Sequence, residues 1–66
     1  MIVNNVKQHR EQKNITQQDL AEAVNVSRQT IIAIEKNNYE PSLGLGLKLA
    51  KFFKVRVEEL FVIKWW

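Results

Sequence analysis

The chain contains no cysteine, a single histidine, one proline and two glycines. Without cysteine it can form neither disulfides nor thiolate zinc sites, and His9 alone cannot supply the imidazoles of the other common zinc sites. We therefore expect no metal and no cofactor. Proline and glycine are also too scarce to build a flexible linker, so residues 1–66 are expected to form one domain.

Long hydrophobic runs are missing as well. The longest, residues 31–34 and 61–63, are far shorter than the roughly 20 residues that a membrane span needs. Residues 1–5 lack the basic start and the long apolar stretch of a secretory signal. No membrane contact is expected, and the cytoplasm is the expected location.

Basic residues exceed acidic residues by ten to seven, which gives a net charge of +3 and an isoelectric point near 9.5. This excess suits a polyanionic partner but is equally compatible with simple solubility. The small size matters more, because below about 70–80 residues one core seldom supplies more than about 3–5 kcal/mol. Oligomerisation is the remaining source of stability.

Five helices and one small sheet are predicted from the apolar periodicity, caps and breakers. The helices are expected at residues 5–13, 17–24, 28–36, 43–53 and around 58–60, and a strand over 61–66 is expected to pair with residues 1–3. N-caps are expected at Asn4 or Asn5, Thr16, Ser27 and Ser42, and Asp19 completes a capping box with Thr16. Asn25 and Asn37 stand at helix ends, where positive φ is common.

Residues 16–36 carry the most informative pattern, two short helices separated by a three-residue turn, as in the helix-turn-helix. Apolar side chains let these helices share one core, and they stand at Leu20, Val24, Val26, Ile31 and Ile34. An ordinary helix hairpin is the alternative.

The outer face of the second of these helices favours DNA reading. Five residues fall within an arc of about 140° on it, namely Arg28, Gln29, Ile32, Ala33 and Lys36. Arginine and glutamine can bind guanine and adenine edges in the major groove, and apolar groups suit thymine methyls. A plain solvated surface is the alternative.

Several segments together resemble the Cro/repressor-type helix-turn-helix regulators, especially small stand-alone members with a β extension. The segments are Val6-Lys7-Gln8-His9-Arg10, Ile15-Thr16-Gln17-Gln18-Asp19-Leu20-Ala21, Val26-Ser27-Arg28-Gln29-Thr30-Ile31, Ile34-Glu35-Lys36-Asn37 and Pro41-Ser42-Leu43. The resemblance implies an all-α, five-helix, lambda-repressor-like domain with a small antiparallel β-ribbon from the terminal segments. The helix-turn-helix would span about residues 16–36, and a dimerisation region about residues 43–66.

The resemblance also implies roles for individual residues. Gln17 would face the phosphate backbone, Arg28 and Gln29 would reach base edges, and Ile32 and Ala33 would lie deeper against the bases. The remaining DNA-binding candidates are Ser27, Lys36, Asn37, Asn38 and Tyr39, the last three through amides and polar side chains of the turn. Arg10 and Glu35 would form a structural ion pair, with a solvated arginine as the alternative.

A dimer is expected because helix 43–53 carries apolar groups over an arc of about 220°, whereas a surface helix needs a stripe of just over 100°. The apolar tail adds to this excess. The candidate interface residues are Leu45, Leu49, Phe52, Phe61, Ile63, Trp65 and Trp66. The alternative is a strand that only covers its own core. Gly44 and Gly46 either permit a close helix contact or simply weaken the helix, each by about 1 kcal/mol relative to alanine.

The sequence therefore predicts a sequence-specific, DNA-binding transcriptional regulator, a repressor, that binds a pseudo-palindromic operator as a homodimer. No small-molecule ligand is expected. Catalysis is not expected, because His9 is the only imidazole and Ser27 and Ser42 are explained as helix caps. The alternative function is a protein-interaction or antitoxin-like module that uses the helix-turn-helix as a scaffold.

Overall fold

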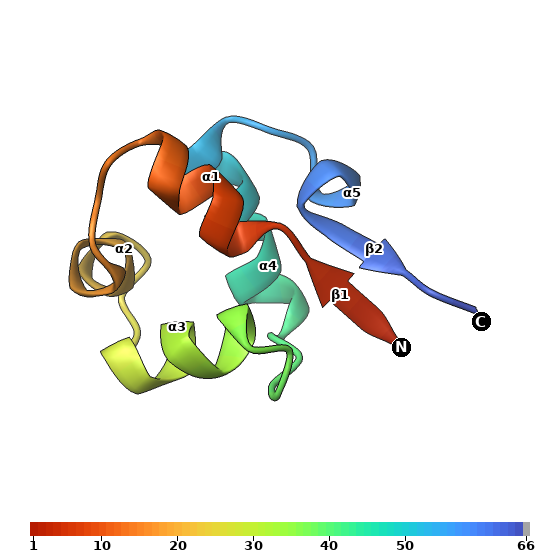
Figure 1. Cartoon of the computed structure of the whole chain (residues 1–66). Helices are drawn as coiled ribbons and strands as arrows, with labels where there is room; N and C mark the ends of the chain where they lie inside the picture. Colours follow the sequence, from red (N-terminus) through yellow and green to blue (C-terminus); the bar gives the residue numbers. More distant parts are fainter. Residues whose placement is uncertain (66) are drawn as a thin grey trace.

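A computed structural model describes residues 1–65 of the chain. Within them, five helices and a two-stranded antiparallel sheet follow in the order β1 (Ile2–Asn4), α1 (Val6–Gln12), α2 (Gln17–Ala23), α3 (Arg28–Glu35), α4 (Leu43–Phe53), α5 (Val57–Leu60) and β2 (Phe61–Ile63) (Figure 1). Each predicted helix is present, and α4 has the predicted bounds. The predicted strand over 61–66 is shorter, ending at Ile63. No helix in this part of the chain is long and apolar enough to cross a membrane.

The predicted caps define where the helices begin. Thr16 Oγ1 accepts a hydrogen bond from the Asp19 amide, and Asp19 Oδ2 accepts one from the Thr16 amide, both at 3.0 Å. The hydroxyl oxygens of Ser27 and Ser42 each accept an amide hydrogen bond at 3.2 Å at the starts of α3 and α4. At α1 the capping side chain is that of Asn4, whose Oδ1 accepts a hydrogen bond from the Val6 amide at 3.0 Å.

Positive φ angles mark the ends of four helices. Asn14, Asn25, Asn37 and Lys54 have φ between 57° and 60°. Asparagine tolerates this left-handed region better than most residues, which explains the first three positions. Lys54 has no such preference, and its residue type does not predict the left-handed conformation at the end of α4.

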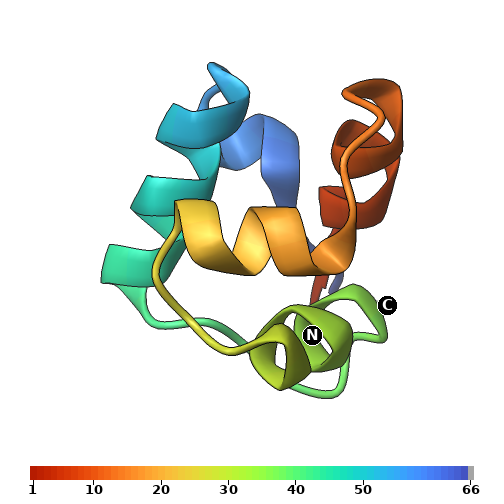
Figure 2. The same ribbon diagram turned by 90° about the vertical axis from the view of Figure 1, so that its left-hand side faces the viewer.

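The hydrophobic core lies where α1, α2, α3, α4 and α5 meet. Figure 2 shows α2 between α1 and α4, with α3 below it. The largest fully buried side chains are Val6, Leu20, Ile31, Ile34, Leu49 and Leu60. The assignment of Leu45 and Leu49 to a dimer interface was wrong, because Leu45 is 9% exposed and Leu49 is completely buried in the chain's own core. The leucines of α4 that face outward are Leu43 and Leu47.

The β-ribbon joins the two ends of the chain beside α4 and α5. Ile2 pairs with Ile63 and Asn4 with Phe61. Gly46, which is buried, faces this junction, and a Cβ added there would lie 3.7 Å from Phe61 Cε2. A Cβ at Gly46 would therefore make an ordinary contact with the ribbon, whereas Gly44 faces open space apart from the Ser42 hydroxyl at 4.0 Å.

Candidate nucleic-acid interface

The outward face of α3 is fixed by its inward face. Ile31 and Ile34 are fully buried against the core, and α2 packs closely on α3. The turn between α2 and α3 is closed by the Val26 amide, which donates to the Ala21 carbonyl at 2.9 Å. Because Ile31 and Ile34 are buried, α3 is held in one rotation about its own axis. The opposite side of the helix therefore faces outward.

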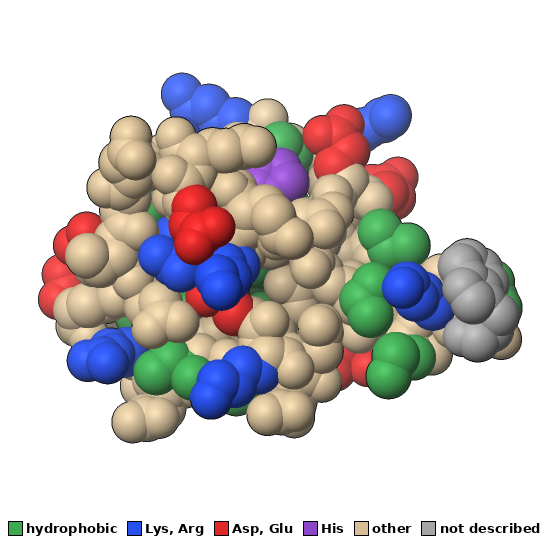
Figure 3. All heavy atoms as spheres, viewed as in Figure 1, with side chains coloured by type: hydrophobic (Ala, Val, Ile, Leu, Met, Phe, Trp, Pro, Cys, Tyr) green, Lys and Arg blue, Asp and Glu red, His purple; other side chains and the backbone are tan. Residues whose placement is uncertain are grey.

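The predicted reading residues are together on this face. Arg28, Gln29 and Lys36 are exposed, whereas Ile32 and Ala33 are half-buried between them. Figure 3 shows Lys and Arg side chains along the edge of the molecule where α3 lies, with hydrophobic groups between them. The result is a ridge with cationic ends, an amide and an apolar centre.

An ion pair ties α1 to the end of α3, as predicted. Arg10 Nε lies 2.7 Å from Glu35 Oε2 and Arg10 Nη2 lies 3.2 Å from Oε1, and the two side chains are only 12% and 4% exposed. Arg10 Nη1 also donates to the Ile15 carbonyl at 3.0 Å. The hydrogen bond with Glu35 raises the pKa of Arg10 above its ordinary value, which favours the charged guanidinium. The alternative of a solvated arginine is excluded.

Gln17 also belongs to this cluster. Its Nε2 donates to Glu35 Oε1 at 3.1 Å, so one N–H of its side chain is directed at the ion pair. The role of Gln17 toward the phosphate backbone stays a prediction, because the contact uses one of the two N–H groups of this side chain. Sequence reasoning missed the contact because Gln17 and Glu35 lie on different helices, and only their packing brings them together.

The turn after α3 differs from expectation in one respect. The amides of Asn37 and Asn38 donate to the carbonyls of Ile34 and Ala33, both at 2.9 Å, so these backbone donors are occupied by the helix end. The side chains of Asn38 and Tyr39 are exposed beyond them. The amides of Asn37 and Asn38 are therefore not available to a phosphate, whereas the exposed side chains of this turn are.

Asn4 has a structural role that goes beyond the N-cap predicted from the sequence. Its Nδ2 donates to the Ile34 carbonyl at 2.8 Å and to Asn37 Oδ1 at 3.0 Å, while its Oδ1 caps α1. One side chain thus joins β1, α1 and the end of α3. The position of the outward face of α3 is therefore coupled to the β-ribbon.

The candidate dimer residues are divided by the structure. Phe52 and Phe61 are half-buried and pack against the core, whereas Ile63 and Trp65 are 50% and 83% exposed. Trp66 lies outside the described residues. The large exposed apolar side chains that the prediction omitted are Met1, Leu43, Leu47 and Val62.

Comparison with known proteins agrees with this geometry. Residues 6–60 match the family model described as helix-turn-helix. The chain is 56% identical over 59 residues to an uncharacterized HTH-type transcriptional regulator of Methanocaldococcus jannaschii, covering 89% of each chain. It is 47% identical over 58 residues to YgzD, an uncharacterized HTH-type transcriptional regulator of Bacillus subtilis, covering 88% of each.

A phage repressor and a solved structure extend the comparison. The transcriptional repressor RstR of the cryptic phage CTXphi, from Vibrio cholerae, is 32% identical over 60 residues, which are 91% of this chain and 54% of the repressor. The crystal structure of a protein from Bacteroides fragilis described as DNA-binding superposes with a TM-score of 0.83 at 31% identity, covering 92% of this chain and 98% of that one. This family is not enzymatic. The chain belongs to the helix-turn-helix family of Cro/repressor-type transcriptional regulators.

Proposed function

We propose that the protein is a sequence-specific DNA-binding repressor that acts as a homodimer on a pseudo-palindromic operator. The observation that carries the proposal is the outer face of α3, where Arg28 and Gln29 are exposed at the start of a helix whose opposite face is buried. A helix held in this way enters a major groove as a rigid body. Its first residues then reach base edges.

In this proposal the residues of the ridge divide into two groups. Arg28 and Gln29 bind guanine or adenine edges, and Ile32 with Ala33 contacts thymine methyls. Lys36 and the side chains of the following turn bind phosphates, which hold the helix in register but carry no sequence information. Ser27, whose hydroxyl caps α3, lies at the helix end that approaches the backbone.

Two considerations support the dimer and the repressor role. A subunit of this size has a small core, and it exposes several large apolar side chains, among them Leu43 and Trp65 at 76% and 83% exposure. Two subunits related by a two-fold axis would place two α3 helices about 34 Å apart, one helical turn of DNA. The phage relative is named a repressor, and occlusion of a promoter needs no more than a bound footprint.

Selection from a randomised duplex pool, followed by sequencing, tests the proposal. The experiment needs two salt concentrations, because affinity for DNA depends steeply on salt. A two-fold symmetric motif with half-sites about one helical turn apart is the expected result. Failure to enrich any sequence, with weak binding that disappears at physiological salt, would reject DNA reading in favour of a protein-interaction or antitoxin-like module.

A further inference from the structure

An apolar hollow of about 130 Å³ opens between the β-ribbon and the start of α4. It is lined mainly by Ile2, Pro41, Leu43, Gly46, Val57 and Phe61. A Cβ at Gly46 would contact Phe61 and Val57, which both line the hollow, so the missing side chain of this glycine is part of its space. It is separate from the outer face of α3, and none of the proposed DNA contacts uses it.

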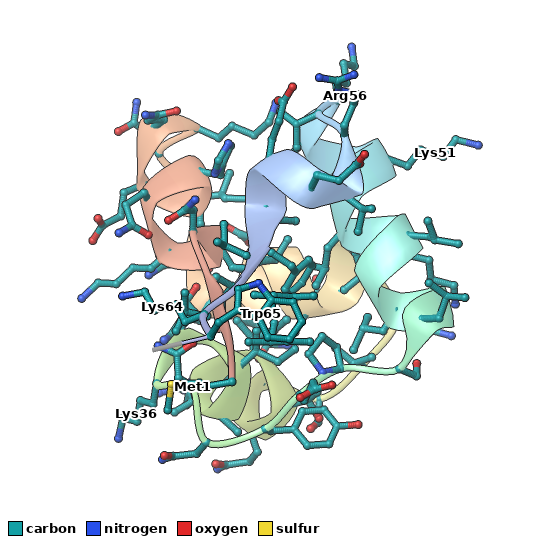
Figure 4. The ribbon with its side chains drawn as sticks, turned by 90° about the vertical axis from the view of Figure 1, so that its right-hand side faces the viewer. Met1, Lys36, Lys51, Arg56, Lys64 and Trp65 are labelled. Carbon is teal, nitrogen blue, oxygen red and sulfur yellow. The ribbon has the colours of Figure 1, made fainter. Side chains whose placement is uncertain are left out.

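The most exposed large apolar side chain of the described residues is Trp65, at 83%. The backbone before it is fixed, because the Lys64 amide donates to the Met1 carbonyl at 2.7 Å and the Met1 amino group donates to the Lys64 carbonyl at 3.2 Å. Figure 4 shows Trp65 beside Met1 and Lys64 at the end of the ribbon. This indole is therefore presented from a paired backbone, yet it does not fill the hollow of its own chain.

We propose that Trp65 of each subunit inserts into the hollow of a second copy of this chain. A two-fold axis makes the contact reciprocal, so one knob and one hollow per chain suffice for two contacts. The charges fit as well, because Lys64 precedes Trp65 and Glu40 lines the hollow. Insertion brings Lys64 to the rim that carries Glu40 of the partner subunit. The inference rests on the homodimer proposed above and names its anchor.

The two glycines of α4 provide a matched pair of variants. Gly46→Ala places a methyl group in the hollow at ordinary contact distance, 3.7 Å from Phe61 Cε2, so the fold tolerates it. Gly44→Ala places the same group in open space, 4.0 Å from Ser42 Oγ. Both changes replace glycine with the better helix former alanine in α4, and only the first narrows the hollow.

Sedimentation velocity over a concentration series then measures the dimer dissociation constant. Trp65→Ala should raise it about thirtyfold, the size of an interface hot spot, and Gly46→Ala by about the same factor, because a narrowed hollow excludes the indole at both contacts, whereas Gly44→Ala should leave it unchanged. Thermal unfolding at a concentration where all variants are monomeric checks that the two glycine variants are at least as stable as the parent. Equal dissociation constants for Gly46→Ala and Gly44→Ala would overturn the proposal.

Mixing the two damaged chains is the sharper test. A heterodimer of Trp65→Ala and Gly46→Ala retains one intact contact, with the indole of the second chain in the open hollow of the first, whereas each homodimer retains none. The mixture should therefore associate about fivefold more tightly than either chain alone, measured by energy transfer between labelled chains. No gain on mixing would refute the proposed insertion.

The outcomes separate this inference from the proposed function. If the parent is a dimer and none of the three substitutions changes its dissociation constant, the Trp65 contact is refuted and the proposed dimeric repressor is unaffected. If the parent remains a monomer on a selected DNA site, both the proposed homodimer and the Trp65 contact are refuted. If the parent selects no DNA sequence but the two mixed variants associate more tightly than either alone, DNA reading is refuted and the Trp65 contact is supported.

Discussion

Removal of Arg10 is the perturbation for which the structure gives the sharpest expectation. In Arg10→Met the aliphatic part of the side chain is preserved, but Glu35 loses both guanidinium contacts while its side chain stays 4% exposed. The carboxylate keeps one hydrogen bond, from Gln17 Nε2. Breaking a buried pair by removing one partner costs about 3–5 kcal/mol, because the remaining charge is left without compensation.

For a domain of this size, 1 kcal/mol corresponds to about 4–8 °C in Tm. We therefore expect Arg10→Met to lower Tm by at least about 12 °C, with unfolding followed by circular dichroism at 222 nm at constant protein concentration. Constant concentration matters because association stabilises the folded state by mass action.

A second ion pair serves as the control. Arg56 and Glu59 are separated by 3.6 Å, but their side chains are 80% and 51% exposed. Figure 4 places Arg56 at the end of the molecule away from Lys36, which follows α3. Exposed pairs contribute about 0–1 kcal/mol, so Arg56→Met should change Tm by only a few degrees.

The double variant Arg10→Met, Glu35→Leu separates the two contributions. Because it removes the stranded carboxylate as well, it should be more stable than Arg10→Met alone, even though it loses the Gln17 contact. The reasoning would be refuted if Arg10→Met costs under about 1 kcal/mol, or if the double variant is as unstable as the sum of the two single changes.

Three further predictions concern Arg28, Lys54 and Asp19. Arg28→Ala should cost about 1–3 kcal/mol on the selected operator and spare binding to unrelated DNA in fluorescence anisotropy, whereas an equal loss on all DNA would make Arg28 a phosphate contact. Lys54 has φ of 59°, so Lys54→Gly should stabilise the fold by about 0.5–1 kcal/mol in urea unfolding, while Lys51→Gly within α4 should destabilise it by about 1 kcal/mol. Hydrogen bonds from the Thr16 backbone and side chain lower the pKa of Asp19, so its contribution to stability is present above its unfolded pKa of about 3.9 and is lost as the pH falls through the lower folded value. Asp19→Asn should therefore flatten the stability profile below about pH 4, and an unchanged acid limb would contradict the assignment.

Most of the local structure was predictable because its causes are local. Thr16, Ser27 and Ser42 begin helices by accepting amides three residues along the chain, and their identity alone announces this. Asn25 and Asn37 end helices by adopting positive φ, again a property of the residue itself. The inward and outward faces of α3 likewise follow from the helical repeat of Ile31 and Ile34.

Helix α4 shows where periodicity alone was insufficient. Its leucines occupy both sides of the helix, so the pattern predicts apolar surface nearly all round but cannot say which side meets the core. Packing assigned Leu45 and Leu49 to the interior and left Leu43 and Leu47 exposed. Selection between two apolar faces depends on the position of the neighbouring helices, which is a non-local property.

The sequence by itself determined the helices, their caps, the helix-turn-helix and the Arg10–Glu35 pair, because residue type, short spacing and family resemblance carry that information. Tertiary structure decided that Gln17 donates to Glu35, that Asn4 connects the β-ribbon to α3, and that a hollow beside Gly46 lies open while Trp65 is exposed. Each of these depends on groups that are distant in the sequence. Their contacts form only when the whole core has packed, since the free energy that fixes them is shared among all the helices.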